Sequence, residues 1–152
     1  MIHLVDITEE NWLEAAKLRV TEQQQAFLDH SLGILARGYV YRSCNGRVIG
    51  IAKDERLIGL ALVRDFTEEP LGYDLQQFMI DREHQGKGYG SEALGLILKL
   101  LRTEGRYPHV EVCVNRADAP ALRVYEKAGF VDSGYIDDEL PHCINLICHL
   151  NK

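Results

Sequence analysis

The chain has 152 residues, 46% of them hydrophobic and 26% charged, which suffices for one folded domain with its own core. Seventeen basic residues against 23 acidic residues give a formal net charge of -6, which argues against a general nucleic-acid-binding protein. Solubility explains this charge, and the charge is also compatible with the attraction of a small cationic substrate.

The sequence has no segment typical of export or of a membrane span. The amino-terminal residues, MIHLVDITEENW, lack a basic stretch followed by an apolar run, and Lys99 interrupts the longest apolar stretch. The four cysteines form no C-x-x-C pair, and the residues Cys143, Cys148, His142 and His149 would alternate between the faces of a strand. We therefore expect a cytoplasmic protein with free thiols and no metal site.

In the first half of the chain, the apolar pattern predicts a strand, two helices and three further strands. The first strand covers residues 2–5, and Thr8 follows it as a candidate helix cap. Apolar residues then recur at helical spacing, at Trp12, Leu13, Ala16 and Val20. The remaining expected elements are a helix over residues 23–35 and strands over residues 48–53, 57–63 and 73–80.

The second half begins with a strongly apolar helix, whose stripe consists of Ala93, Leu94, Ile97, Leu98 and Leu101. Residues 110–114 are rich in β-branched valine and predict a strand. A helix over residues 119–128 has Asp118 as its candidate cap, Pro120 in its first turn and Gly129 just past its end. Strands over residues 130–136 and 144–150 close the chain.

The summed order of elements is βααβββαβαββ. This order predicts a fold of the α/β or α+β class, with a mixed central sheet of about seven strands and helices on both faces. No internal repeat or low-complexity linker divides the chain, so residues 1–152 are expected to form a single domain.

The sharpest functional signal is the segment Gln85-Gly86-Lys87-Gly88-Tyr89-Gly90, between a predicted strand and the apolar helix. Alternating glycines permit positive φ and close approach of a ligand, and the amides at a helix N-terminus attract an anion. A phosphate or pyrophosphate is the ligand that this pattern favours. The Walker pattern is absent, and the dinucleotide fingerprint G-x-G-x-x-G fails because Ser91 stands where its third glycine belongs.

The pattern Q/R-x-x-G-x-G/A is filled by Gln85, Gly88 and Gly90, and residues 121–130 are similar to an A-x-x-x-Y-x-x-x-G-F helix. In both segments the chain resembles the GNAT family of acyl-CoA-dependent N-acetyltransferases. The resemblance implies the GNAT fold, with acetyl-CoA as co-substrate and no metal. It also implies a cofactor site made of Phe78, Met79, Ile80, Gln85, Gly86, Lys87, Gly88, Tyr89, Gly90, Ser91, Asn115 and Tyr125.

The resemblance further implies direct transfer of an acetyl group to an amine. Tyr125 would protonate the departing thiolate, a step for which a phenol with an ordinary pKa of about 10 is suited, and it would also pack on the apolar stripe of its helix. A backbone N–H near Met79 or Ile80 would polarise the thioester carbonyl. Asp74 is a candidate base, with a surface or substrate-contact role as the alternative.

Within the family, the chain is most similar to the bacterial spermine/spermidine acetyltransferase branch, which implies a polyamine as the amine substrate. Aminoglycosides, amino acids and protein N-termini are alternative acceptors, and a non-catalytic CoA-binding regulatory domain is an alternative of another class. A homodimer is common among chains that resemble this one, and no nucleic acid or membrane partner is expected. The candidate substrate-binding residues are Glu22, Asp29, Asp74 and Gln76, with Glu68, Glu69 and the cluster Asp137-Asp138-Glu139 as further acidic candidates.

Overall fold

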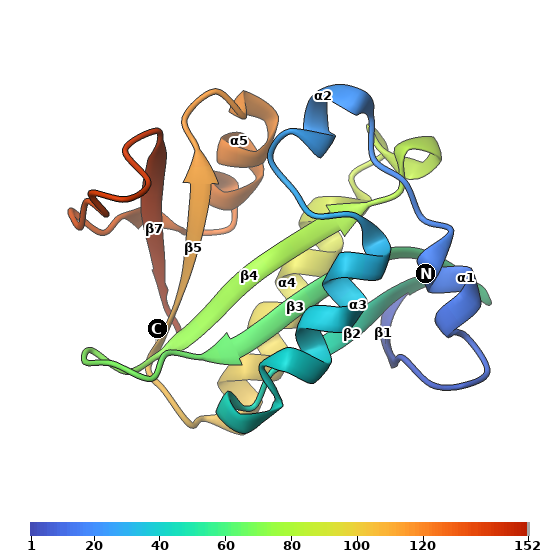
Figure 1. Cartoon of the computed structure of the whole chain (residues 1–152), viewed down its shortest axis with the longest axis horizontal. Coiled ribbons are helices and arrows are strands. Elements are labelled where there is room, and N and C mark those ends of the chain that lie inside the picture. The colour runs from blue at the N-terminus through green and yellow to red at the C-terminus, as the bar shows by residue number, and fades with distance from the viewer. Residues whose placement is uncertain (152) are drawn as a thin grey trace.

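The computed structural model describes residues 1–151 and contains a seven-stranded sheet in the order β1-β2-β3-β4-β5-β7-β6 (Figure 1). All neighbouring strands are antiparallel except β4 and β5, which are parallel. The predicted mixed sheet of about seven strands is therefore confirmed. The strands are β1 (Ile2–Asp6), β2 (Arg47–Lys53), β3 (Arg56–Asp65), β4 (Tyr73–Ile80), β5 (His109–Asn115), β6 (Val131–Asp132) and β7 (Cys143–His149).

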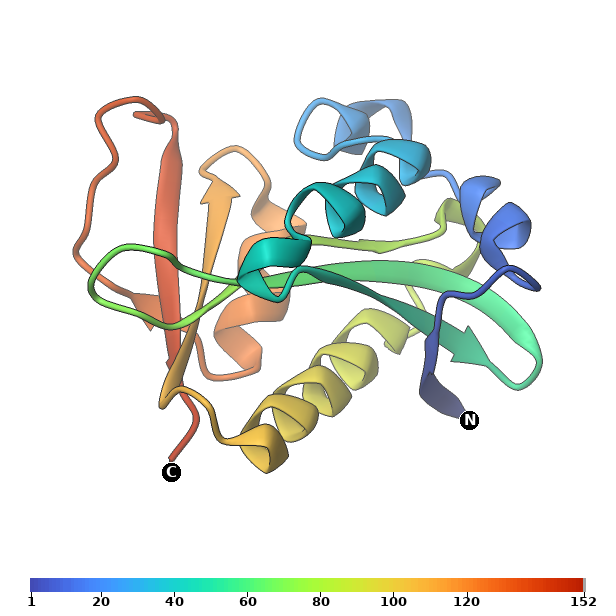
Figure 2. The ribbon, with the colours of Figure 1, turned by 60° about the horizontal axis from the view of Figure 1, so that its bottom comes forward.

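Helices cover both faces of the sheet, as Figures 1 and 2 show. One face carries α1 (Trp12–Ala16) and α3 (Ser31–Val40), and the other carries α4 (Tyr89–Glu104) and α5 (Ala119–Lys127). Successive residues of a strand point to opposite faces, so β3 sends Leu60 and Leu62 toward α3 but Ala61 and Val63 toward α4. Within residues 1–151, no helix is both long and apolar enough to cross a membrane.

The two helices of the second half form where the sequence predicts them. The buried residues of α4 are Ala93, Leu94, Ile97, Leu98 and Leu101, the same five that make the apolar stripe. In α5, Asp118 Oδ1 accepts a hydrogen bond from Ala121 N (3.3 Å), and Gly129 takes a positive φ of 105° just past the end. Apolar spacing and local caps thus determine both helices.

The prediction for residues 8–35 is wrong in detail. Thr8 caps no helix; α1 ends at Ala16, and Trp12 and Leu13 lie exposed. The helix cannot reach Val20 because Arg19 N donates to Asp81 Oδ1 (2.8 Å) and Arg19 O accepts from Arg82 N (2.7 Å).

The helix expected over residues 23–35 is two helices, α2 (Glu22–Gln25) and α3. Between them, the Asp29 N–H bonds to Gln77 Oε1 (3.1 Å) on β4 instead of to a helical carbonyl. At the other end of the chain, the strand expected over residues 130–136 ends at Asp132, whose carboxylate accepts from the N–H of Gly134 at φ 82°. A contact distant in sequence therefore interrupts the expected helix at Asp29, and a local turn ends the expected strand at Asp132.

The strands β4 and β5 pair only at Tyr73–Val110 and Asp74–Glu111, and then diverge (Figure 1). The divergence begins beside a β-bulge, because Leu62 pairs with Gln77 whereas Val63 pairs with Leu75, which leaves Gln76 as the extra residue. A bulge bends its strand and increases the local twist. The rest of β4 is therefore free of β5, and a gap opens between them.

At the paired end of β4, side chains form a network that we call the closed-end network (Arg47, Asp65, Tyr73, Glu104, Arg106 and Tyr107). Asp65 Oδ2 accepts hydrogen bonds from Asn45 Nδ2 (2.7 Å), Arg106 Nη1 (2.7 Å) and the Tyr107 hydroxyl (3.1 Å). Glu104, the last residue of α4, accepts from the Tyr73 hydroxyl (3.2 Å) and pairs with Arg47. The network fixes the end of α4 to β3 and β4.

We predict that Asp65→Asn destabilises the protein and changes its response to acid. Burial alone would raise the pKa of Asp65, but its three donors outweigh burial and lower that pKa. The stabilisation is therefore present above the ordinary aspartate pKa of about 3.9 and is lost as pH falls through the lower folded-state value. Denaturant unfolding at pH 7 should show a loss of roughly 2 kcal/mol.

The loss should shrink as pH falls below about 4, because the carboxylate is then protonated in the unfolded chain, and at still lower pH it is protonated in the folded wild-type protein too. Asp138→Asn, at an exposed residue, is the matched control and should change nothing. An equal loss for Asp65→Asn at pH 7 and pH 2.5 would contradict the assigned ion pairing.

Candidate functional site

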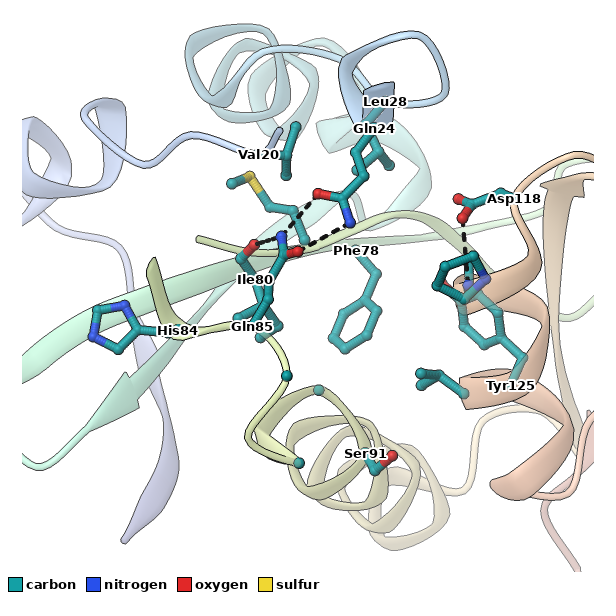
Figure 3. A pocket seen from close by; sticks show the side chains of 17 residues that line it. Val20, Gln24, Leu28, Phe78, Ile80, His84, Gln85, Ser91, Asp118 and Tyr125 are labelled. Carbon is teal, nitrogen blue, oxygen red and sulfur yellow. Dashed lines mark hydrogen bonds between the residues drawn. The ribbon is translucent and has the colours of Figure 1, made fainter. Parts of the chain in front are cut away.

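A cleft of about 300 Å³, which we call the main cleft, lies where β4 leaves β5 (Figure 3). Phe78, Met79 and Ile80 of β4 line it, and Figure 3 shows Phe78 and Tyr125 of α5 facing the cleft from opposite sides. The glycine loop (residues 85–90) and α2 complete the wall. The structure thus brings together most of the predicted cofactor residues.

The glycine loop has a backbone that only glycine adopts easily. Gly86 and Gly88 have φ of 75° and 83°, and a Cβ built on either residue would meet no atom within 4 Å. The backbone therefore borders open space on the side where a side chain would stand. A ligand can approach the main chain closely at both positions.

The first turn of α4 presents unpaired amides to this space. Gly88 is the N-cap and supplies no side chain, and across residues 1–151 the N–H groups of Gly88, Tyr89, Gly90 and Ser91 have no hydrogen-bond acceptor. The helix dipole adds a positive partial charge at the same end. The loop therefore fits a phosphate or pyrophosphate group, and the apolar side chains beside it fit an uncharged arm.

Tyr125 is buried in the wall of the main cleft with 6% of its surface exposed. Its ring centroid lies 6.2 Å from that of Phe78 and 5.3 Å from that of Phe130. Burial raises the pKa of the Tyr125 phenol above its ordinary value, so the hydroxyl is protonated at neutral pH. A protonated phenol at this position can donate a proton into the cleft.

Three predicted cofactor residues lie outside the lining of the main cleft. Lys87 is exposed, and the ring of Tyr89 lies 5.9 Å from Lys53 Nζ. Asn115 ends β5 as expected, but its Oδ1 accepts a hydrogen bond from Ala117 N (2.9 Å). The side chain of Asn115 is therefore engaged in a local turn.

A second cavity, of about 630 Å³, lies on the face of β4, β5 and β7 opposite α4. Along β5, His109, Glu111 and Cys113 alternate with the core residues Val110, Val112 and Val114, which places the first three on the open face. The cavity is lined by the acidic residues Glu68, Glu69, Asp74, Glu111 and Asp137 and by the basic residues Arg64 and His109. Its lining is therefore strongly acidic.

Asp74 and Gln76 both line the second cavity and neither lines the main cleft. Arg64 Nε donates to Asp74 Oδ2 (2.9 Å), and the guanidinium also stacks on Tyr41, 4.6 Å from the ring centroid. Burial raises the pKa of Asp74, although the Arg64 contacts oppose that rise. Asp74 therefore lines a different cavity from most of the predicted cofactor residues, and its role as a base or as a substrate contact stays a prediction.

The other two predicted substrate residues are not together. Glu22 is exposed on α2 and lines neither cavity. Asp29 Oδ2 accepts from Arg37 Nε (2.8 Å), and Arg37 Nη1 donates to Gln76 Oε1 (2.8 Å). Asp29 therefore holds α3 against the bulge of β4.

The sequence reasoning missed residues on both sides of the site. Val20, Gln24, Leu28 and His84 line the main cleft, but none belongs to a recognisable motif. Glu111 was missed because it alternates with valines as any exposed strand residue would. Asp118 was recognised only as a helix cap, yet it also lines the main cleft.

No group of three or more His, Cys, Asp or Glu side chains is placed to hold a metal ion anywhere in residues 1–151. Cys143 and Cys148, which are close in sequence, differ in their burial. Cys143 and Cys148 lie on β7, where Cys148 is buried in the core and Cys143 is partly exposed. All four cysteines are free thiols.

Comparison with known proteins gives a consistent result. Residues 4–130 match the sequence profile of the Acetyltransferase (GNAT) family. A spermine/spermidine N(1)-acetyltransferase of Bacillus subtilis is 23% identical over 146 residues, which are 90% of this chain and 91% of that protein.

Two solved structures share the fold. A spermidine N-acetyltransferase of Vibrio cholerae in complex with CoA and spermine has a TM-score of 0.74 at 17% identity, over 99% of this chain and 96% of its own. An aminoglycoside acetyltransferase in complex with coenzyme A has a TM-score of 0.78 at 15% identity, over 98% and 95% of the two chains.

We predict that Arg64→Met destabilises the protein in a pH-dependent way. Because burial already raises the folded-state pKa of Asp74, loss of the guanidinium should raise that pKa further. A group with a raised folded-state pKa stabilises the fold below its unfolded pKa, and that contribution is lost as pH rises. Denaturant unfolding should show a loss of roughly 2 kcal/mol at pH 8 and a smaller loss at pH 4.

The double variant Arg64→Met/Asp74→Asn is the control, because a neutral amide needs no cation partner. It should recover most of the loss at pH 8. A pH-independent loss that the double variant does not recover would assign the effect to the stacking on Tyr41 instead.

Proposed function

The chain belongs to the Acetyltransferase (GNAT) family and is an N-acetyltransferase; we propose that it transfers the acetyl group of acetyl-CoA to a primary amine of a polyamine such as spermidine or spermine. One observation carries the proposal. The gap between β4 and β5 places unpaired backbone amides at one wall and the buried phenol of Tyr125 at the other.

The main cleft suits the two ends of acetyl-CoA. The amides of the glycine loop and of the first turn of α4 would bind the pyrophosphate, and Phe78, Ile80 and Val124 would flank the apolar arm. The net charge of -6 repels a polyanion, so local dipoles must supply the attraction. Acetyl-CoA contributes an acetyl group activated as a thioester.

Tyr125 is the residue that we assign to proton donation. Transfer forms a C–N bond and breaks a C–S bond, so one proton passes from the amine to water and another must reach the sulfur. The Tyr125 hydroxyl is protonated, lines the cleft and has no hydrogen-bond partner in residues 1–151. It is therefore free to donate to a sulfur held beside Phe78.

The second cavity supports a polycationic acceptor. Five carboxylates and one guanidinium line it, and within residues 1–151 no Lys or Arg forms an ion pair with Glu111, whose Oε2 lies 3.8 Å from His109 Nε2. Burial raises the pKa of Glu111, as expected for a carboxylate without a strong partner, and an ammonium group would supply that partner. Asp74 is proposed here as a substrate-contact residue.

The two cavities lie along one strand. Asp74 lines the second cavity and Phe78 the main cleft, and four residues of strand separate their Cα atoms by at most about 13 Å. A polyamine carries further ammonium groups along its chain. One primary amine can therefore occupy the main cleft while another ammonium group reaches the acidic cavity.

The relatives support this choice of acceptor. The Bacillus subtilis relative covers nearly the whole chain, and the Vibrio cholerae structure with the same fold contains spermine. An aminoglycoside is the alternative acceptor. It is also a polycationic amine, and one of the proteins that share this fold is an aminoglycoside acetyltransferase. The charge of the second cavity favours both over an amino acid or a protein N-terminus.

We predict that spermidine and spermine release free CoA thiol from acetyl-CoA more efficiently than monoamines do. A thiol-release assay over polyamines, aminoglycosides, monoamines and peptides with a free N-terminus measures this directly. Glu111→Gln should raise the KM for spermidine about fivefold and leave the KM for a monoamine unchanged. Added salt should raise the spermidine KM more than the monoamine KM.

A higher kcat/KM for aminoglycosides would transfer the proposal to that class. No thiol release with any amine, in a protein that binds CoA, would support a non-catalytic CoA-binding domain instead.

We predict that Tyr125→Phe slows turnover far more than it weakens CoA binding, because it removes the proton donor and keeps the ring packed against Phe78 and Phe130. General-acid catalysis contributes typically 10²-fold or more, so kcat should fall by about that factor. Calorimetric titration should give a CoA dissociation constant within about twofold of the wild-type value. Unchanged kcat would remove Tyr125 from the mechanism.

A further inference from the structure

The side chains of Gln24 on α2 and Gln85 in the glycine loop bond to each other in both directions. Gln24 Nε2 donates to Gln85 Oε1 (3.0 Å), and Gln85 Nε2 donates to Gln24 Oε1 (2.8 Å). Figure 3 shows this pair bridging α2 and the glycine loop at the edge of the main cleft. The two residues are 61 positions apart in the sequence.

Protein partners use both N–H donors of the Gln85 amide and also bond to its oxygen. Its Nε2 also donates to the carbonyl of Ile80 (2.7 Å), the last residue of β4, so both atoms of the amide are engaged. Gln85 therefore joins three segments: the end of β4, the glycine loop and α2. A side chain held in this way serves as a bracket for the loop more readily than as a ligand of a phosphate.

Gln24 is itself held by the helix that carries it. Thr21 N donates to Gln24 Oε1 (3.2 Å), and Gln24 N donates to Thr21 Oγ1 (3.3 Å), which together form a capping box. No other side chain of α2 bonds to the glycine loop in residues 1–151. The helix has no buried residue of its own, so the Gln24 contact is its main link to the loop.

We propose that Gln24 is a positioning residue, which acts through Gln85 to hold the glycine loop in the conformation that presents its amides. Gly86 and Gly88 give the backbone of this loop conformational freedom, and no atom lies within 4 Å of the place where a Cβ would stand on either residue. A loop that is ordered before binding loses less conformational entropy when a ligand arrives. Gln24 thus raises the affinity for the pyrophosphate without contacting it. The inference rests on the proposed binding of acetyl-CoA at this loop.

The test is a double-mutant cycle with Gln24→Met, Gln85→Met and the double variant, in which methionine keeps the length of each side chain. Calorimetric titration of the full chain with CoA should show a dissociation constant about fivefold higher for Gln24→Met, since a net hydrogen bond is worth about that factor. The double variant should bind no more weakly than Gln85→Met alone. Gln25→Met is the matched control, because Gln25 Nε2 bonds only to Leu28 O within its own segment, and it should change nothing.

Additive losses in the cycle would show that Gln24 contacts the ligand directly, and an unchanged dissociation constant for Gln24→Met would remove its role; either result overturns the proposal. A second measurement does not depend on CoA. In the free protein, NMR order parameters of the Gly86 and Gly88 amides should fall from rigid values of ~0.85 to below ~0.6 in Gln24→Met. Unchanged order parameters overturn the inference, whereas failure of the wild-type chain to bind CoA overturns the proposed function alone.

Discussion

The parallel pairing of β4 with β5 stops after two residue pairs, and the rest of the molecule is arranged around that interruption. The extra residue Gln76 bends β4 away from β5, so the end of β4 borders a gap where a continuing sheet would have its next strand. The amino end of α4 and one face of α5 then become the walls of that gap. On the opposite face of the sheet, α3 covers β2 and β3 but not β5 and β7, which leaves the acidic cavity open. The irregularity in β4 therefore opens the main cleft, whereas the position of α3 leaves the acidic cavity open.

The parts of the fold that the sequence predicts well are those determined by local signals. The apolar stripe of α4, the cap of α5 at Asp118 and the strand over residues 73–80 need no knowledge of distant contacts. The glycine loop belongs to this group, because its residue pattern and its position before a helix are both local. The helices before residue 40 do not, since the chain leaves the helical conformation at Arg19 and Asp29 to bond with Asp81 and Gln77.

The same distinction holds for the candidate site. Tyr125 and the loop glycines stand in recognisable motifs and line one cleft. Glu68, Asp74 and Glu111 belong to three different segments, and only the arrangement of β3, β4 and β5 brings them into one cavity. The two sites therefore differ in charge. Backbone dipoles at the glycine loop suit an anion, and the carboxylates of the second cavity suit a cation.

Helix α4 connects the two ends of this arrangement mechanically. Its last residue, Glu104, is held in the closed-end network, and its first turn carries the unpaired amides. Sixteen helical residues span about 24 Å, so a tilt of only about 2° at the anchored end displaces the loop by ~1 Å. Errors of that size in the placement of a reacting group cost on the order of 10²-fold in rate. The tilt of α4, and with it the position of the glycine loop, is therefore limited at the other end of the helix, where Arg47 and Tyr73 hold the carboxylate of Glu104.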